Sequence, residues 1–261
     1  MEITLDRVLK NFKKYRYLLF ELTKKNIKLK YRRSYLGILW TLLEPILTTF
    51  VLTVVFINIR GKKDHAFPVY ILTGRLLYSF FSQATKQAMK SIRSNSSMIK
   101  KVYVPKYIYP VSDVLSNFII FLISTVVLFG AMIVFKVQPT KYILYSIIPL
   151  LQLLVLSLGM GLILATLAVF FRDMEYLWGV ALMLIMYTAA IFYDAGIVSD
   201  EWKWIFNANP IFHIILNFRN CVYGHPLDMN ALLISSGYSI ISLVAGIVLF
   251  YKKQDKFILN I

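Results

Sequence analysis

Cysteine, histidine and acidic residues are scarce in this chain, and each shortage excludes a kind of site. Its 261 residues include one Cys, three His and 13 Asp and Glu, against 29 Lys and Arg. Cys221 alone cannot form a disulfide within the chain, and the scattered His65, His213 and His225 cannot complete a metal cluster with it. We therefore expect neither an internal disulfide nor a metal site.

A nucleotide-binding loop of the form Gly-x-x-x-x-Gly-Lys-Ser/Thr is also missing from the sequence. Such a loop places backbone N–H groups around the phosphates of ATP. We therefore expect no cofactor in this chain, and no ATP bound in that manner.

Long apolar runs, by contrast, dominate the chain, of which 58% is hydrophobic. About 20 apolar residues in a helix are enough to cross the hydrocarbon core of a bilayer, which is about 30 Å thick. The runs cover 36–58, 67–89, 111–135, 142–171, 176–193 and 231–251. The sequence therefore predicts an all-α integral membrane protein, residues 1–261 forming one domain with six transmembrane helices.

The net charge of +16 would suit a nucleic-acid-binding protein, but the Lys and Arg residues lie beside the ends of the apolar runs. We therefore expect no nucleic-acid partner. With the N-terminus inside, inner segments carry the large majority of the 29 Lys and Arg residues. The positive-inside rule then predicts that both termini and the basic loop 86–106 are cytoplasmic, whereas 194–229 is external.

Residues 1–35 place apolar side chains at helical spacing among many Lys and Arg residues. This pattern predicts an amphipathic helix that lies in the membrane interface, with its cations on the lipid head groups; a solvated basic tail is the alternative. Tyr31, Arg32, Arg33 and Trp40 mark the passage from this helix into the first span.

Glu44 and Arg75 are the ionisable residues deepest in the predicted spans. A charge at the bilayer centre costs about 2.5–3.5 kcal/mol on insertion scales, so we expect the two to pair or to face a conduit. Separate snorkelling, or a protonated Glu44, is the alternative. Pro45 removes a backbone donor and is expected to bend the first span, whereas Asp113 is expected at a helix start.

The basic segment 95–105 can form a short cytoplasmic helix, because Asn95 or Ser97 can cap its start and Pro105 can end it. A loop that serves only membrane topology is the alternative.

The segment 194–229 is too polar and too short in its apolar parts to cross, and predicts external re-entrant or interfacial helices between the fifth and sixth spans. Trp202, Trp204, Phe212 and Tyr223 offer aromatic faces on which sugar rings stack. An interfacial aromatic belt, which membrane proteins have whatever they transport, is the alternative.

Several motifs now resemble one family, the permease subunits of ABC-2 type exporters of lipid-linked polysaccharides such as teichoic acids, O-antigens and capsule-like glycans. They are Tyr31-Arg-Arg-Ser-Tyr-Leu-Gly-Ile-Leu-Trp40 with Pro45, residues 95–105 with Pro110, Phe171-Arg-Asp173, and Asn209-Pro210 with Arg219 and Gly224. The segment 189–193 departs from the family, which often has a Ser-Pro pair there.

The resemblance implies a non-catalytic half-transporter of a bacterial inner or plasma membrane. It implies a homodimer docked on two copies of an ATPase subunit that binds ATP and Mg, with a lipid-linked polysaccharide as substrate among the membrane lipids. It also implies that 95–105 is the coupling helix, that Arg172 and Asp173 form a cytoplasmic turn, and that 194–229 is the external gate.

These assignments give two sets of candidate residues. The ATPase-coupling set is Arg93, Asn95, Ser97, Met98, Ile99, Lys100, Lys101, Val102, Tyr103 and Pro105, in which Met98, Ile99, Val102 and Tyr103 would insert into the partner. The set for the external gate and glycan stacking is Trp202, Trp204, Asn209, Pro210, Phe212, Arg219 and Tyr223.

Two other functions compete with polysaccharide export. One is an ABC-2 permease for a drug or a lipid. The other is a membrane-embedded transferase acting on lipid-linked sugars, which would need carboxylates or histidines clustered at one face. Glu44, Asp113, Asp173 and Asp194 are instead spread over both faces and the interior.

Overall fold

The computed structural model describes residues 5–32, 34–60, 65–102, 104–194, 196 and 199–260. Every regular element in these residues is a helix. Arg33 and Tyr103, two of the candidate residues, lie outside the described residues.

The six apolar runs all form helices, with ends that differ from the predicted ones by a few residues. The longer helices are α1 (Leu5–Tyr31), α2 (Trp40–Arg60), α3 (Phe67–Ser94), α5 (Ile108–Val134), α6 (Ile147–Phe170), α7 (Met174–Thr188) and α10 (Met229–Lys253). The shorter ones are α4 (Ser96–Lys101), α8 (Lys203–Asn207), α9 (Pro210–Val222) and α11 (Phe257–Asn260). Short 3-10 turns precede α2, α6, α8 and α11.

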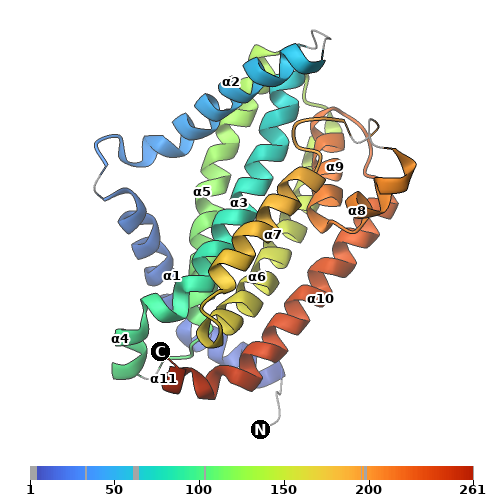
Figure 1. The fold of residues 1–261 in the computed structure, drawn as a ribbon. Coiled ribbons are helices and arrows are strands. Elements are labelled where there is room, and N and C mark those ends of the chain that lie inside the picture. The colour runs from blue at the N-terminus through green and yellow to red at the C-terminus, as the bar shows by residue number, and fades with distance from the viewer. Residues whose placement is uncertain are drawn as a thin grey trace.

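The helices form an elongated bundle (Figure 1). α3, α5 and α6 pack side by side along its length, and α10 packs against α6. Both labelled chain ends, α4 and α11 lie at one end of the bundle, whereas α8 and α9 lie toward the other (Figure 1). The predicted coupling segment and the predicted external segment are thus at opposite ends.

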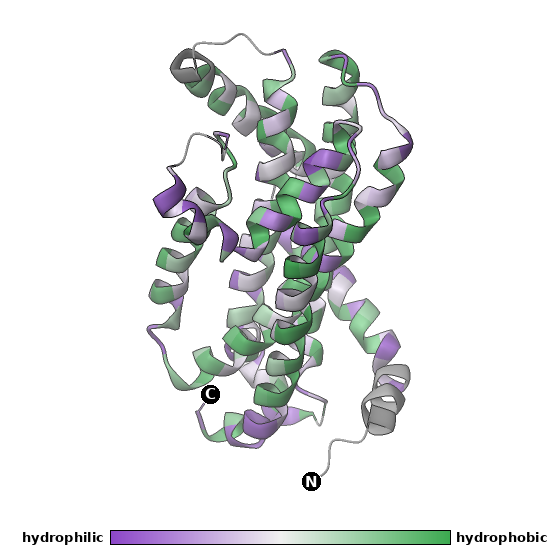
Figure 2. Cartoon of the chain, turned by 90° about the vertical axis from the view of Figure 1, so that its right-hand side faces the viewer, coloured by the Kyte–Doolittle hydropathy of each residue, from purple (hydrophilic) through white to green (hydrophobic). Residues whose placement is uncertain are grey.

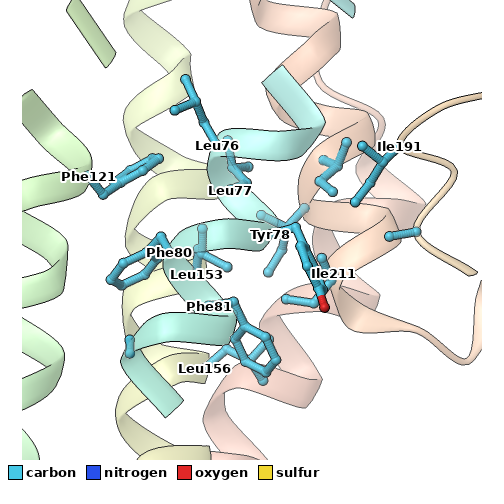
Figure 3. Packing of buried hydrophobic residues seen from close by; sticks show 14 of the residues in the cluster. Leu76, Leu77, Tyr78, Phe80, Phe81, Phe121, Leu153, Leu156, Ile191 and Ile211 are labelled. Carbon is cyan, nitrogen blue, oxygen red and sulfur yellow. The ribbon is translucent and has the colours of Figure 1, made fainter. Parts of the chain in front are cut away.

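α3 is the centre of the bundle. Its side chains point in several directions, toward Phe121 of α5, Leu153 and Leu156 of α6 and Ile211 of α9 (Figure 3). The Tyr78 hydroxyl also donates a hydrogen bond to the carbonyl of Leu182 in α7, at 2.9 Å. Protein therefore surrounds this helix on most sides.

In the described residues, four helical stretches are long and apolar enough to cross a membrane: Gly37–Phe56, Ile108–Val134, Lys141–Phe170 and Met229–Asn260. α7 is apolar but has 15 residues. α3 is not among the four, because its sequence carries charged and amide side chains. Hydrophobic residues cover much of the bundle (Figure 2), which defines a multi-pass membrane protein without fixing its number of crossings.

α6 packs closely on two neighbouring helices at Gly159 and Gly161. A Cβ on Gly159 would collide with the backbone of α10 at Ser242 and Leu243, and one on Gly161 would lie 3.0 Å from the Cβ of Ala88 in α3. Glycine at these two positions lets α6 lie directly against both neighbours.

Candidate functional site

A narrow groove lined by polar side chains lies between α2, α3 and α5 and the C-terminal end of α1. Its lining includes Lys30, Thr41, Glu44, Arg75, Gln83 and Ser124. The groove encloses about 50 Å³, which is room for a few water molecules and not for a sugar. In a single chain, then, this polar groove has room for water but not for a large solute.

The polar side of α3 repeats every four residues, at Arg75, Ser79, Gln83 and Gln87. Residues four apart share one face of a helix, so these side chains form a track toward the end that carries α4. The first three line the groove. The mean hydropathy of the whole helix does not show this polar face, although the four-residue spacing is visible in the sequence.

Glu44 and Arg75 both line the groove, the first exposed and the second half-buried. No salt bridge joins them in the part of the chain that the structure describes. The charge of Glu44 acts on Lys30 instead: burial lowers the pKa of the Lys30 ammonium, and the Glu44 carboxylate partly opposes this. Lys30 also donates to Gln83 Oε1 at 2.8 Å, which fixes the end of α1 on α3.

Pro45 lies inside α2 and cannot donate to the carbonyl of Thr41. The structure supplies another donor, because the hydroxyl of Ser124 in α5 bonds this carbonyl at 2.9 Å. The gap in the α2 hydrogen-bond ladder therefore becomes a tie between two helices of the groove.

The expectation that Asp113 sits at a helix start is wrong. α5 begins at Ile108, so Asp113 lies in its second turn, buried among amides. Its Oδ1 accepts hydrogen bonds from Asn26 of α1 at 2.7 Å and from Gln87 of α3 at 3.2 Å, and Asn117 donates to Gln87 Oε1 at 2.8 Å. This network joins three helices beside the groove.

α1 has the predicted amphipathic form where its side chains are described. Leu19 and Leu22 are buried against the bundle, whereas Lys24 and Lys25 are exposed. At the passage into α2, Tyr31 is half-buried and Arg32 and Trp40 are exposed. The exposed aromatic and cationic groups suit the boundary between head groups and hydrocarbon.

α4 is shorter than predicted. It runs from Ser96 to Lys101 and ends well before Pro105, whose carbonyl instead accepts from the Ile108 amide at the start of α5. Asn95 occupies the N-cap position, but its amide donates backward to the Ser91 carbonyl at 2.8 Å. Ser97 is inside the helix, so neither predicted capping interaction forms.

The faces of α4 also differ from the expectation. Ile99 is buried in a cluster with Leu19, Tyr109 and Phe257, so it cannot insert into another protein without leaving its own core. Met98 and Val102 are 42% and 54% exposed and point outward, as do the exposed Lys100 and Lys101. The outward-facing apolar pair is therefore Met98 and Val102.

Arg93 and Arg172 lie together at the α4 end, where they line a hollow of about 320 Å³ with Ser96 and Asn260. Asp173 occupies the N-cap position of α7 but makes no side-chain cap. A salt bridge of 2.7 Å between Lys90 and Glu175 joins α3 to α7 nearby. The 171–173 turn is thus part of the same surface as α4.

At the opposite end, Asn209 and Pro210 form the joint between α7 and α9. Asn209 Oδ1 accepts from the Ile211 amide, and its Nδ2 donates to the Ile185 carbonyl at 3.0 Å and to Thr188 Oγ1 at 2.8 Å. Pro210 takes the first position of α9, where its missing N–H costs nothing. The pair starts α9 and ties it to the end of α7.

Arg219 completes the same joint. It is 8% exposed, and its guanidinium donates to the carbonyls of Ala190, Tyr70 and Ile191 at 2.9, 3.1 and 3.1 Å. Ala190 has a φ of +49°, so a left-handed alanine makes the bend after α7. Arg219 fixes that bend by bonding the carbonyls around it.

Phe212, Arg219 and Tyr223 line one cavity at the α9 end of the bundle, whereas Trp202 and Trp204 do not and are 57% and 65% exposed. The structure therefore separates the predicted aromatic gate into two groups. Tyr70, Asp194, Asn220 and His225 join the first group, and no motif in the sequence pointed to any of them for this site.

The fold defines a multi-pass membrane protein with a polar groove in its interior, and comparison with known proteins identifies the family. The ABC-2 type transporter family matches residues 17–223, so the chain belongs to it. The O-antigen export system permease protein RfbA of Klebsiella pneumoniae is 27% identical over 242 residues, covering 92% of this chain and 93% of that protein. RfbA of Myxococcus xanthus is 26% identical, covering 96% and 98%. The polysialic acid transport protein KpsM of Escherichia coli is 22% identical, covering 88% and 91%.

Proposed function

We propose that this chain is the non-catalytic permease of an ATP-driven exporter that moves a lipid-linked polysaccharide out across a bacterial inner or plasma membrane. The observation that carries the proposal is its similarity, over nearly the full length of both chains, to permeases named for O-antigen export. A separate ATPase subunit would bind the ATP and Mg.

Six crossings are proposed, formed by α2, α3, α5, α6, α7 and α10, with both termini in the cytoplasm. The position of both ends and α4 at one end of the bundle, opposite α8 and α9, supports this orientation (Figure 1). α3 can cross despite the charge of Arg75, because neighbouring helices surround α3 and Arg75 faces the polar groove.

A homodimer is proposed because the groove of one chain is too small for a glycan. Large apolar side chains on α2 and α7, such as Phe50 and Val180, are 67% and 69% exposed. A second copy could face such surfaces and enclose a wider conduit, while the rest would face lipid.

α4 is proposed as the element that couples ATP hydrolysis to transport. Met98 and Val102 face outward and would seat in a cleft of the ATPase, with Lys100 and Lys101 beside acidic groups. Ile99 ties α4 to the bundle, and a single residue, Asn95, separates α4 from α3. Movement of the partner would therefore reach α3 directly.

The test is genetic and biochemical. Deleting the gene should leave the lipid-linked glycan on the cytoplasmic side of its host membrane, and the intact chain should restore surface glycan. Normal export without the chain, or ATP hydrolysis by the purified chain alone, would refute the proposal. The double variant Met98→Asp/Val102→Asp should abolish export and retain membrane insertion, whereas Leu259→Asp, an 84% exposed site at the same end, should export normally.

A further inference from the structure

A cavity of about 350 Å³ lies at the end of the bundle that carries α9, between the start of α3, the end of α7 and α9 itself. Its lining combines the aromatic side chains of Tyr70, Phe212 and Tyr223 with the polar side chains of Asp194, Asn220 and His225. Cavities of about 300 to 1,000 Å³ that combine aromatic walls with a few polar groups are typical ligand sites.

The aromatic walls are held in place before any ligand arrives. The Tyr70 hydroxyl donates to the Tyr193 carbonyl at 2.8 Å, and the Tyr223 hydroxyl donates to the Ala66 carbonyl at 3.1 Å. Phe212 packs edge to face on Phe206, with 6.0 Å between ring centroids. Because these rings are already ordered, a ligand would lose little side-chain entropy on binding.

The cation in the wall does not make the cavity an anion site. Arg219 donates to three backbone carbonyls, and its guanidinium carbon lies 3.5 Å from the centroid of the Tyr70 ring. Its hydrogen-bonding capacity is thus directed into the joint between α3, α7 and α9. Asp194 adds a negative charge to the lining, which disfavours a phosphate.

A lipid chain also fits poorly, because a carboxylate, an amide and an imidazole interrupt the apolar lining. Asp194 is itself oriented, since its Oδ1 accepts from the Gly196 amide at 3.0 Å. An uncharged ligand that has an apolar ring face and several hydroxyl groups matches both kinds of lining. Hexoses have this chemistry, with C–H groups on one face and hydroxyls at the edge.

We propose that this external cavity binds one uncharged hexose unit of the exported glycan, stacked on Phe212 or Tyr223 and hydrogen-bonded at its edge by Asp194 and Asn220. The site rests on the proposed function and adds to it a place on the external side where the emerging chain is held. Binding of a single unit makes the site suitable for a repeating polymer, because each repeat presents the same group in turn.

The experiment uses the full-length permease in lipid nanodiscs and, as probe, short oligosaccharides prepared by partial hydrolysis of the polysaccharide that the host exports. Affinity is measured by calorimetry and the contacting sugar protons by saturation-transfer NMR. Asp194→Asn removes the charge of the hydrogen-bond acceptor, and Asn220→Ala removes the amide that bonds the sugar. Each variant should weaken binding about tenfold. Leu216→Phe, which narrows the cavity from α9, should abolish binding.

Two matched variants serve as controls. Asp200→Asn changes an exposed carboxylate of the same segment outside the lining, and Trp204→Leu removes an exposed aromatic ring; both should bind as the unchanged protein does. Any of three results would overturn the site. They are unchanged affinity in all three cavity variants, loss of binding in Trp204→Leu alone, or no binding by the unchanged protein. If the unchanged chain nevertheless restores export in the deletion strain, the proposed function stands without the cavity site, whereas failure of that rescue contradicts the proposed function itself.

Discussion

Two regions of this molecule are built around an arginine, and they use it in opposite ways. At the joint of α3, α7 and α9, Arg219 is buried and donates to the carbonyls of Tyr70, Ala190 and Ile191. In the groove between α2 and α3, Arg75 is half-buried and donates no hydrogen bond to any described residue. The two arginines lie on neighbouring helices, because Arg219 of α9 lies against Gly74, the residue before Arg75 in α3.

The difference separates stability from transport. A buried cation whose donors are satisfied by backbone carbonyls fixes a bend, and its removal takes a charged donor away from each of those carbonyls. A cation in a polar groove without such hydrogen bonds has a desolvation cost that they do not offset, which is typical of residues kept for function. Stability should therefore depend on Arg219, and transport should depend on Arg75.

The largest effect is expected for Arg219→Met. This change removes the guanidinium from three carbonyls: those of Ala190 and Tyr70 keep the hydroxyls of Tyr70 and Thr73 as donors, whereas that of Ile191 loses its side-chain donor. With the packing of a buried side chain lost as well, we expect a loss of about 3 kcal/mol in the free energy of unfolding. The measurement is thermal unfolding of the detergent-solubilised protein, followed by the yield of monodisperse protein. A variant as stable as the unchanged chain would show that water replaces the guanidinium and that the joint does not need it.

Gly74→Ala tests how tightly α3 approaches the joint. A Cβ at this position would lie 2.7 Å from Arg219 Nη2 and 3.2 Å from Ile191 Cγ2, so the arginine must shift. We expect a loss of about 1–3 kcal/mol by overpacking. Gly130→Ala is the control, because nothing lies within 4 Å of its added Cβ, and better helix propensity should leave it unchanged or more stable. If both variants were equally stable, the joint would not require the close approach of α3 at Gly74.

Arg75→Met should have the contrasting phenotype. Because no described partner loses a hydrogen bond, unfolding should change by less than about 1 kcal/mol, whereas glycan export should fall about tenfold or more. Export is measured as surface glycan at matched amounts of inserted protein. Arg75→Lys, which keeps the charge, should retain most of the activity. A destabilisation as large as that of Arg219→Met would instead make this arginine a second structural one.

Much of this architecture could be predicted from the sequence, because apolar length and basic flanks are local signals. They located every long helix, including α1, and the short α4. The number of crossings was harder, since α3 is stabilised by contact with α5, α6 and α9 and no average over its own residues records that contact. Its polar track at every fourth position was present in the sequence and signals a helix that faces protein and water.

The side-chain roles were less predictable. Asn209 and Arg219 looked like external gate residues, and the structure places them in a joint, because a family motif can equally preserve a bend. Ile99 looked like an insertion residue, but the direction of a side chain on a six-residue helix depends on what that helix rests against. The external cavity unites α3, α7 and α9, which no sequence spacing could have shown.

The smallest effect is expected for the single hydrogen bond that joins α5 to α2 beside the groove. Ser124→Ala removes the donor to the Thr41 carbonyl, which Pro45 leaves without an intrahelical partner, and should cost about 0.5–1.5 kcal/mol. In Pro45→Ala the restored amide can bond that carbonyl within α2, so Ser124→Ala should cost less in this background. Unfolding of the four proteins in a double-mutant cycle gives the coupling directly. If the two costs in stability add, the hydrogen bond between α2 and α5 does not depend on the proline. If they are coupled, Pro45 stabilises the contact by leaving the Thr41 carbonyl available to the Ser124 hydroxyl.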